Sequence, residues 1–140
     1  MPIHKGIHFF EHGAGEASTI VLLHGAGGNQ RQWPYQLRRL PGWHTLAPDL
    51  PGHGHSEGRA YARVDDYAEQ MEAWLEGGPE GKLVLLGHSL GAAVALKMAV
   101  RKQLTLSGLV LIGAGLRMPV NPSPLNYFAR PVREQLGGEQ

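Results

Sequence analysis

The sequence predicts an α/β fold, a mostly parallel sheet with helices on both faces. Three short, continuous apolar runs are typical of strands buried on both faces, at 19–23, 83–86 and 109–112. Stretches with helical spacing of apolar residues lie between these runs, which favours a parallel sheet. Two of the runs end in glycine-rich turns. In such sheets ligands bind at the carboxyl ends of the strands, so both turns fall where a site is expected.

Length and composition suit one globular domain. The chain has 140 residues, 42% of them hydrophobic and 18% charged, with a formal net charge of +1. It has no cluster of Lys and Arg and no apolar run near the ~18 residues of a membrane span, so we expect neither a nucleic-acid partner nor a spanning helix. The N-terminus lacks the apolar region of a signal peptide, which favours a cytoplasmic location. Without cysteine, disulfides and a thiolate nucleophile are excluded.

The first segment has the periodicity of a strand. Residues 3–11 alternate between two faces, which predicts an edge strand or one arm of a hairpin. His4, His8 and His12 lie four apart, and on a helix they would form a metal-binding stripe. Neighbouring proline and glycine residues disfavour a helix here, so a solvated strand face is the preferred interpretation.

The first buried run, 19–23, ends in the turn His24-Gly25-Ala26-Gly27-Gly28. Such a turn exposes backbone N–H groups with little steric cover and is suited to hold an anion. A phosphate and the transient oxyanion of acyl transfer are the two alternatives. The phosphate is disfavoured, because a dinucleotide fingerprint needs glycine where Gln30 stands and no Gly-Lys-Ser/Thr sequence occurs. A plain strand-to-helix turn is a third alternative.

The middle of the chain continues the alternation of helices and strands. Helices are expected at 31–40 and 64–75, and a buried strand is expected at 44–48. The loop that follows this strand, 49–56, begins with Asp49, which we interpret as an acceptor of backbone N–H groups. A metal arm formed by His53, His55 and Asp49 is the weaker alternative, because nothing else in the chain has matching ligand spacing.

The pentapeptide Gly87-His88-Ser89-Leu90-Gly91 joins the apolar run 83–86 to a helix-favouring run at 92–100. A serine at the apex of a strand–turn–helix presents its hydroxyl above the sheet edge, where a substrate carbonyl could meet it. The two glycines let the strand and helix backbones approach closely. Alone, this pattern arises by chance in roughly one such chain in ten, so a plain turn is the alternative. The second glycine-rich turn and the parallel-sheet pattern favour the nucleophile.

Three motifs, at 24–28, 49–56 and 87–91, resemble those of the α/β-hydrolase family, in the branch of lipases, esterases and C–C bond hydrolases. The resemblance implies that Ser89 is the nucleophile of a serine hydrolase acting on a carboxylic ester or a related acyl or C–C bond. It implies that the backbone N–H groups of Ala26 and Leu90 form the oxyanion hole. No cofactor and no metal are implied. It further implies residues that line or brace the site, namely His24, Gly25, Gly27, Gly28, His88 and Asp49.

The sequence departs from the family after Ser89. The family's triad runs in the order serine, acid, histidine, whereas all eight histidines here precede Ser89 and the only later carboxylates are Glu134 and Glu139. We therefore expect a chain truncated before the triad acid and histidine, and nearly inactive alone, since loss of the base costs on the order of 10⁶ in rate. The alternative is a non-catalytic ligand-binding or assembly module that retains the turns.

The expected organisation follows from this departure. Residues 1–115 would be the N-terminal part of the hydrolase core, and residues 116–140 the start of a lid or a C-terminal tail. Without further strands, the apolar strand Leu109–Ile112 would form an open edge. Such an edge invites pairing with a second copy of the chain or with a C-terminal half.

Overall fold

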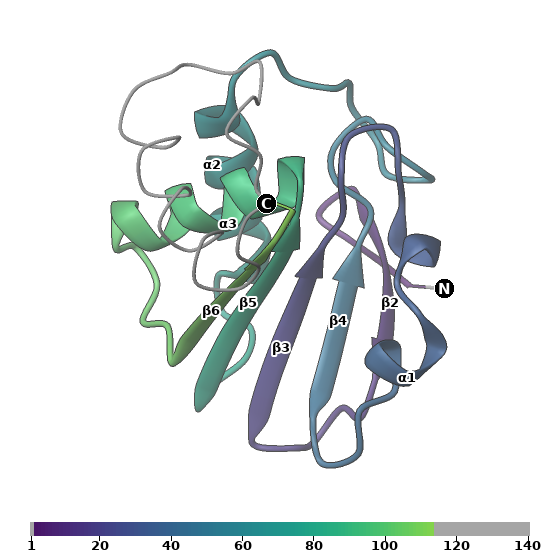
Figure 1. Ribbon diagram of the computed structural model, residues 1–140, viewed down its shortest axis with the longest axis vertical. Helices are drawn as coiled ribbons and strands as arrows, with labels where there is room; N and C mark the ends of the chain where they lie inside the picture. Colours follow the sequence, from purple (N-terminus) through teal and green to yellow (C-terminus); the bar gives the residue numbers. More distant parts are fainter. Residues whose placement is uncertain (1, 114–140) are drawn as a thin grey trace.

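The computed structural model describes residues 2–113 and has the α/β architecture that the sequence predicts (Figure 1). A six-stranded sheet with the order β1-β2-β4-β3-β5-β6 forms its centre. The four strands β4, β3, β5 and β6 are parallel, whereas β1 and β2 are antiparallel additions at one edge. The strands are β1 Ile3–His4, β2 Ile7–His12, β3 Ser18–Leu23, β4 His44–Pro48, β5 Lys82–His88 and β6 Gly108–Ile112. Residues 116–140, the expected lid or tail, lie outside the described residues.

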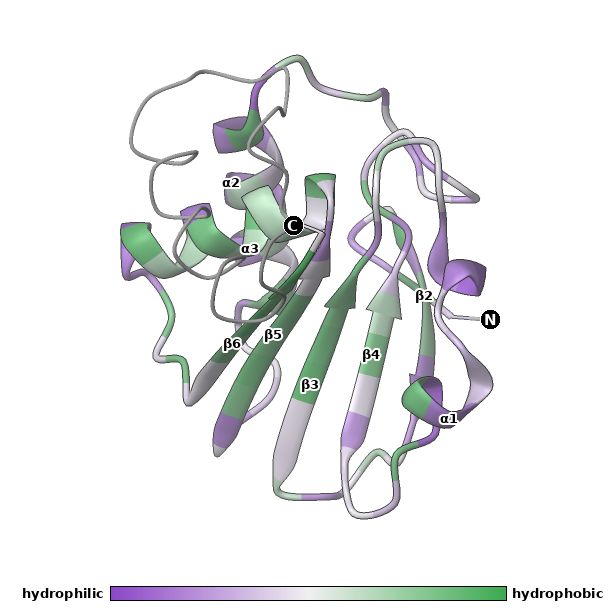
Figure 2. Cartoon of the chain, in the orientation of Figure 1, coloured by the Kyte–Doolittle hydropathy of each residue, from purple (hydrophilic) through white to green (hydrophobic). Residues whose placement is uncertain are grey.

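Helices cover both faces of the sheet. The long helices α2 (Val64–Leu75) and α3 (Leu90–Arg101) pack together on one face. The opposite face is covered by a smaller apolar cluster around the 3-10 helix η1 (Gln30–Gln32) and the helix α1 (Tyr35–Arg38). In Figure 2, β3 and β5 are apolar over most of their length, as expected for strands buried between two layers.

The prediction of one helix over 31–40 is wrong in detail. Pro34 separates η1 from α1, and Trp33 before it is extended, with φ −81° and ψ 134°. Proline has no N–H to donate and disfavours helical geometry in the residue before it, so the helix stops and restarts.

The N-terminal segment is a hairpin, one of the two arrangements that its alternation predicts. β1 and β2 are joined by Lys5 and Gly6, whose φ angles of 51° and 80° are both left-handed. Two successive left-handed residues form the tight turn that matches strand twist. β2 then pairs with β4, so that Phe10 lies opposite Ala47.

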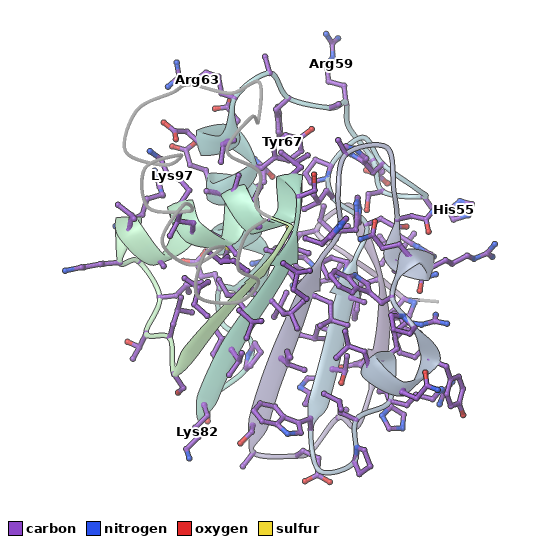
Figure 3. The ribbon with its side chains drawn as sticks, viewed as in Figure 1. His55, Arg59, Arg63, Tyr67, Lys82 and Lys97 are labelled. Atoms are coloured by element: carbon purple, nitrogen blue, oxygen red, sulfur yellow. The ribbon has the colours of Figure 1, made fainter. Side chains whose placement is uncertain are left out.

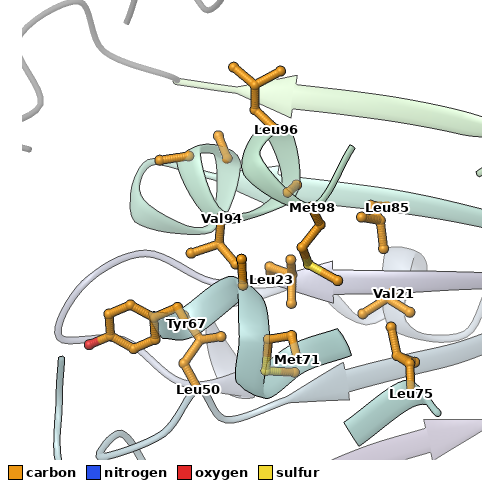
Figure 4. Packing of buried hydrophobic residues seen from close by; sticks show 14 of the residues in the cluster. Val21, Leu23, Leu50, Tyr67, Met71, Leu75, Leu85, Val94, Leu96 and Met98 are labelled. Carbon is orange, nitrogen blue, oxygen red and sulfur yellow. The ribbon is translucent and has the colours of Figure 1, made fainter. Parts of the chain in front are cut away.

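The main core lies between the sheet and the pair α2 and α3 (Figure 4). Val21, Leu23 and Leu85 from the strands meet Met71 of α2 and Met98 of α3, and all five side chains are fully buried.

None of the helices within residues 2–113 is long and apolar enough to cross a membrane. β6 is the last strand of the described sheet, and its Val110 and Ile112 side chains are 38% and 43% exposed.

Candidate active site

The two glycine-rich turns lie side by side. β3 and β5 are neighbouring parallel strands, and Leu23 at the end of β3 is in register with Gly87 near the end of β5. A Cβ atom on Gly25 would lie 3.3 Å from the Cβ atom of Ser89 and 3.3 Å from Nδ1 of His88. The structure thus brings the glycine loop against the serine turn at the carboxyl ends of the strands.

Ser89 stands at the apex of a sharp turn between β5 and α3. Its φ of 56° and ψ of −115° form a left-handed conformation that is rare for a residue with a side chain. Its carbonyl accepts hydrogen bonds from the N–H groups of Ala92 and Ala93, at 3.0 and 3.2 Å, and its own N–H donates to the carbonyl of Ile112 at 3.1 Å. These contacts hold the backbone in a conformation that would otherwise relax.

The glycines on either side of this turn are required by close packing. A Cβ atom on Gly87 would collide with the carbonyl of Gly91, and one on Gly91 would collide with the carbonyl of Leu23. The neighbouring atoms belong to backbone, so they cannot swing aside. Strand, turn and helix can therefore approach this closely only with glycine at both positions.

Two backbone N–H groups near the serine turn have no acceptor within residues 2–113. Leu90 is the first residue of α3, so its N–H has no acceptor within the helix. The N–H of Ala26, in the glycine loop, likewise donates to no acceptor among residues 2–113. The positive end of the α3 helix dipole adds to the local preference for negative charge.

His24 joins the glycine loop to the loop after β4. Its side chain is fully buried, Nε2 accepts the Leu50 N–H at 3.0 Å, and Nδ1 contacts the Gly25 carbonyl at 2.7 Å. Since Nε2 accepts, the ring proton is on Nδ1 and is donated to Gly25. Burial lowers the pKa of the His24 imidazole, although the hydrogen bond to Gly25 acts in the opposite direction.

Asp49 organises the loop that follows β4. Its carboxylate is 1% exposed and accepts the N–H of Gln30 at 2.8 Å and that of His55 at 3.0 Å. The Nδ1 atom of His8 lies 3.0 Å from the same carboxylate. Both carboxylate oxygens of Asp49 are therefore engaged in contacts that hold the loop.

The alternative metal sites receive no support from the geometry. His53 contacts the carbonyl of Pro51 at 3.1 Å, while His55 projects outward from its loop, at the same end of the sheet as Tyr67 and opposite Lys82 (Figure 3). Among residues 2–113, no three His, Asp or Glu side chains are placed to share a metal ion.

One residue of the site, Gln32, was not identified from the sequence. The side chain of Gln32 contacts both turns, with Oε1 3.2 Å from the Gly25 nitrogen and Nε2 3.2 Å from Nδ1 of His88. Gln32 belongs to no motif, and only its position in the segment after the glycine loop could have drawn attention to it.

Comparison with known proteins places these observations in a family. Residues 20–139 match the model of the alpha/beta hydrolase family. Lipase LipV of Mycobacterium tuberculosis is 31% identical over 106 residues, which cover 76% of this chain and 41% of the lipase. The pimeloyl-[acyl-carrier protein] methyl ester esterase of Sodalis glossinidius is 35% identical over 123 residues, covering 82% of this chain and 46% of the esterase.

Solved structures show the same fold. A lipase-esterase related protein from Clostridium acetobutylicum superposes with a TM-score of 0.69 at 23% identity, over 76% of this chain and 46% of that protein. The chain thus spans less than half the length of each of these three relatives. With a family match over most of its length, the chain belongs to the α/β-hydrolase family.

Proposed function

We propose that the chain is the nucleophile-bearing part of a serine hydrolase that cleaves a carboxylic ester or a related acyl bond. The observation that carries the proposal is the strained Ser89 turn, beside which the N–H groups of Leu90 and Ala26 have no acceptor among the described residues. The similarity to a lipase and to a methyl ester esterase supports an ester as the substrate. The cytoplasmic location expected from the sequence stays a prediction.

The proposed reaction has two acyl-transfer steps. The Ser89 hydroxyl loses its proton to a base while its oxygen attacks the carbonyl carbon of the ester. The N–H groups of Leu90 and Ala26 stabilise the oxyanion that forms. The intermediate collapses to an acyl-enzyme as the alcohol leaves with a proton, and water then releases the acid by the same route.

We propose that the base for this reaction lies outside the 140 residues of this sequence. Both nitrogens of His24 are engaged with the backbone, and Nδ1 of His88 faces Gln32. No histidine follows His88 in the sequence. Within residues 2–113, β6 is the edge of the sheet, and further strands added there would extend the sheet and bring a base to Ser89.

Labelling with a fluorophosphonate, which reacts with activated serines, tests the proposal. The full chain alone should label slowly. Adding the C-terminal half of a related α/β hydrolase should accelerate labelling by a factor of about 10³ or more, because a base then activates the hydroxyl. Ser89→Ala should abolish labelling, while Ser107→Ala, at an exposed serine before β6, should leave it unchanged.

Two outcomes would contradict parts of the proposal. Labelling that survives Ser89→Ala would place the nucleophile elsewhere. Rapid ester turnover by the isolated chain, abolished by Ser89→Ala, would show that the chain contains its own base.

A non-catalytic binding module is the second candidate. It is favoured by the structural hydrogen bonds that occupy His24 and His88, the two histidines beside the serine turn. If the chain stays unreactive with every added C-terminal half and binds an apolar acyl compound by calorimetry, this alternative replaces the enzyme.

A further inference from the structure

The amide of Gln32 bridges the two loops that flank the candidate site. Oε1 lies 3.2 Å from the nitrogen of Gly25, in the glycine loop, and Nε2 lies 3.2 Å from Nδ1 of His88, in the serine turn. Gln32 is the last residue of η1, so the bridge extends from the end of this short helix. These loops contain the N–H groups of Ala26 and Leu90, and the bridge therefore spans the two sides of the proposed oxyanion hole.

The chemistry of the bridge fixes its direction. A backbone N–H can only donate, so the Gln32 atom that faces Gly25 has to be the carbonyl oxygen. The amide NH₂ then faces His88 and needs an acceptor. Nδ1 of His88 accepts only when it has a free lone pair, and the ring proton of neutral His88 must therefore be on Nε2.

Gly25, Gly113 and Trp33 surround the His88 ring where this bond forms. A Cβ atom on Gly25 would lie 3.3 Å from Nδ1, and one on Gly113 would lie 3.4 Å from Cδ2 and Nε2 of the same ring. The ring of Trp33 meets it edge-on, with centroids 6.5 Å apart. The half-buried ring thus lies between two glycines, where a side chain at either position would crowd it.

Gly28 leaves space for the Gln32 carbonyl. A Cβ atom on Gly28 would lie 2.5 Å from Oε1 of Gln32, closer than real Cβ contacts occur. The φ angle of Gly28 is not positive, in contrast with that of Gly27 at 76°, so a side chain at Gly28 is opposed by the Gln32 amide, which it would have to displace, and not by backbone conformation.

We propose that Gln32 is a positioning residue that fixes the spacing of the Ala26 and Leu90 N–H groups and holds His88 as the Nε2–H tautomer. Its consequence for catalysis rests on the proposed function, whereas the bridge and the tautomer do not. Gln32 itself need not touch the substrate. It acts through the Gly25 backbone and the His88 ring.

Two substitutions at Gln32 separate the halves of the bridge. Gln32→Leu removes both hydrogen bonds, so the Gly25 amide should exchange with solvent about threefold to tenfold faster and His88 should become a mixture of tautomers. Gln32→Glu offers two acceptors, so Gly25 should keep its protection while the His88 proton moves to Nδ1. Gln36→Leu, at an exposed glutamine of α1, is the matched control and should change neither the Gly25 exchange rate nor the His88 tautomer.

Nuclear magnetic resonance of the ¹⁵N-labelled full chain measures both quantities, the ring tautomer and the amide exchange rate, without any turnover. Gly28→Ala should displace the amide and reproduce the effects of Gln32→Leu, and the double variant should show no further change. Unchanged His88 tautomer and Gly25 exchange in Gln32→Leu would overturn the proposal. Reactivity of Ser89 does not enter these readings, so a failure of the proposed function would be seen separately in the labelling experiment.

Discussion

Ser89 holds a backbone conformation that is costly for a residue with a side chain. The φ of 56° brings its Cβ atom close to backbone, and glycine would avoid this at the expense of greater freedom in the unfolded chain. The same strain keeps the hydroxyl at the apex of the turn. Stability and presentation of the proposed nucleophile are therefore opposed at this position.

Ser89→Gly is expected to raise the free energy of unfolding by about 1 kcal/mol, because relief of strain exceeds the added chain entropy. Ser89→Ala keeps the Cβ atom and should change stability little. Lys102→Gly, at the left-handed C-cap of α3 with φ 57°, is a control for the backbone effect alone. Urea unfolding measures all three, and a destabilised Ser89→Gly would show that the turn is not strained.

Buried His24 should make stability fall on acidification. Because burial lowers its pKa in the folded state, the unfolded chain takes up the proton first, near the ordinary value of about 6.5. The stabilisation is present above that value and is lost as the pH falls below it toward the lowered pKa, at up to about 1.4 kcal/mol per pH unit.

His24→Gln should remove this part of the pH dependence and cost about 2–4 kcal/mol at pH 8, since the Leu50 N–H and the Gly25 carbonyl lose their partner. Urea unfolding at pH 8 and pH 5.5 measures the difference. His4→Gln, at the exposed edge strand β1, is the control. If the free energy of unfolding of His24→Gln still changes with pH as it does in the unsubstituted chain, other titrating groups cause that change.

Individual residues of the site were predictable from the sequence only where they belong to a recognisable motif. The glycine loop and the serine turn were found from strands that end in glycine, and the structure places them together. Gln32 was not found because its role depends on where η1 ends relative to two separate loops. That relation is tertiary and leaves no local pattern in the sequence.

Among the elements, α2 and β4 were predicted with the observed bounds, since strong periodicity and clear stops mark both ends. Asp65 lies in the first turn of α2 and pairs with Lys97 of α3 and with Arg63, at 3.0 and 3.2 Å. Periodicity failed where a local constraint overrode it. Pro34 divided the helix predicted at 31–40, and a two-residue turn divided the first strand.

β6 should promote association as an open edge. Its Val110 side chain is 38% exposed, and beyond β6 no further described strand is paired. Val110→Lys should lower the fraction of associated chain, because a charge on an edge strand opposes strand addition. Sedimentation velocity measures this, with Val100→Lys on the exposed end of α3 as the control. Equal association of both variants would place the contact elsewhere.

Within residues 2–113, the two faces of the sheet are covered unequally. The face toward α2 and α3 has the larger core, whereas the other face is covered near β3 and β4 and is partly exposed at β6. The α/β class was predictable because buried parallel strands form continuous apolar runs. The pairing of β2 with β4 was not predictable, since these strands are not consecutive in the chain.

Stability of the chain should depend mainly on the larger core. Met71→Ala, at a fully buried position of α2 (Figure 4), is expected to cost about 2–5 kcal/mol through lost burial and a residual cavity. Val100→Ala, 52% exposed, should change stability by less than about 0.5 kcal/mol. Chemical unfolding measures both, and a small effect at Met71 would indicate a loosely packed interior.

The contact between Gly28 and Gln32 also bears on how this chain can change over evolutionary time. Alanine at position 28 displaces the Gln32 amide as long as glutamine is present, but it meets a smaller obstacle once position 32 has a short side chain. The same substitution is therefore disfavoured in one background and tolerated in another. The order in which two mutations occur would decide which sequences a lineage can reach.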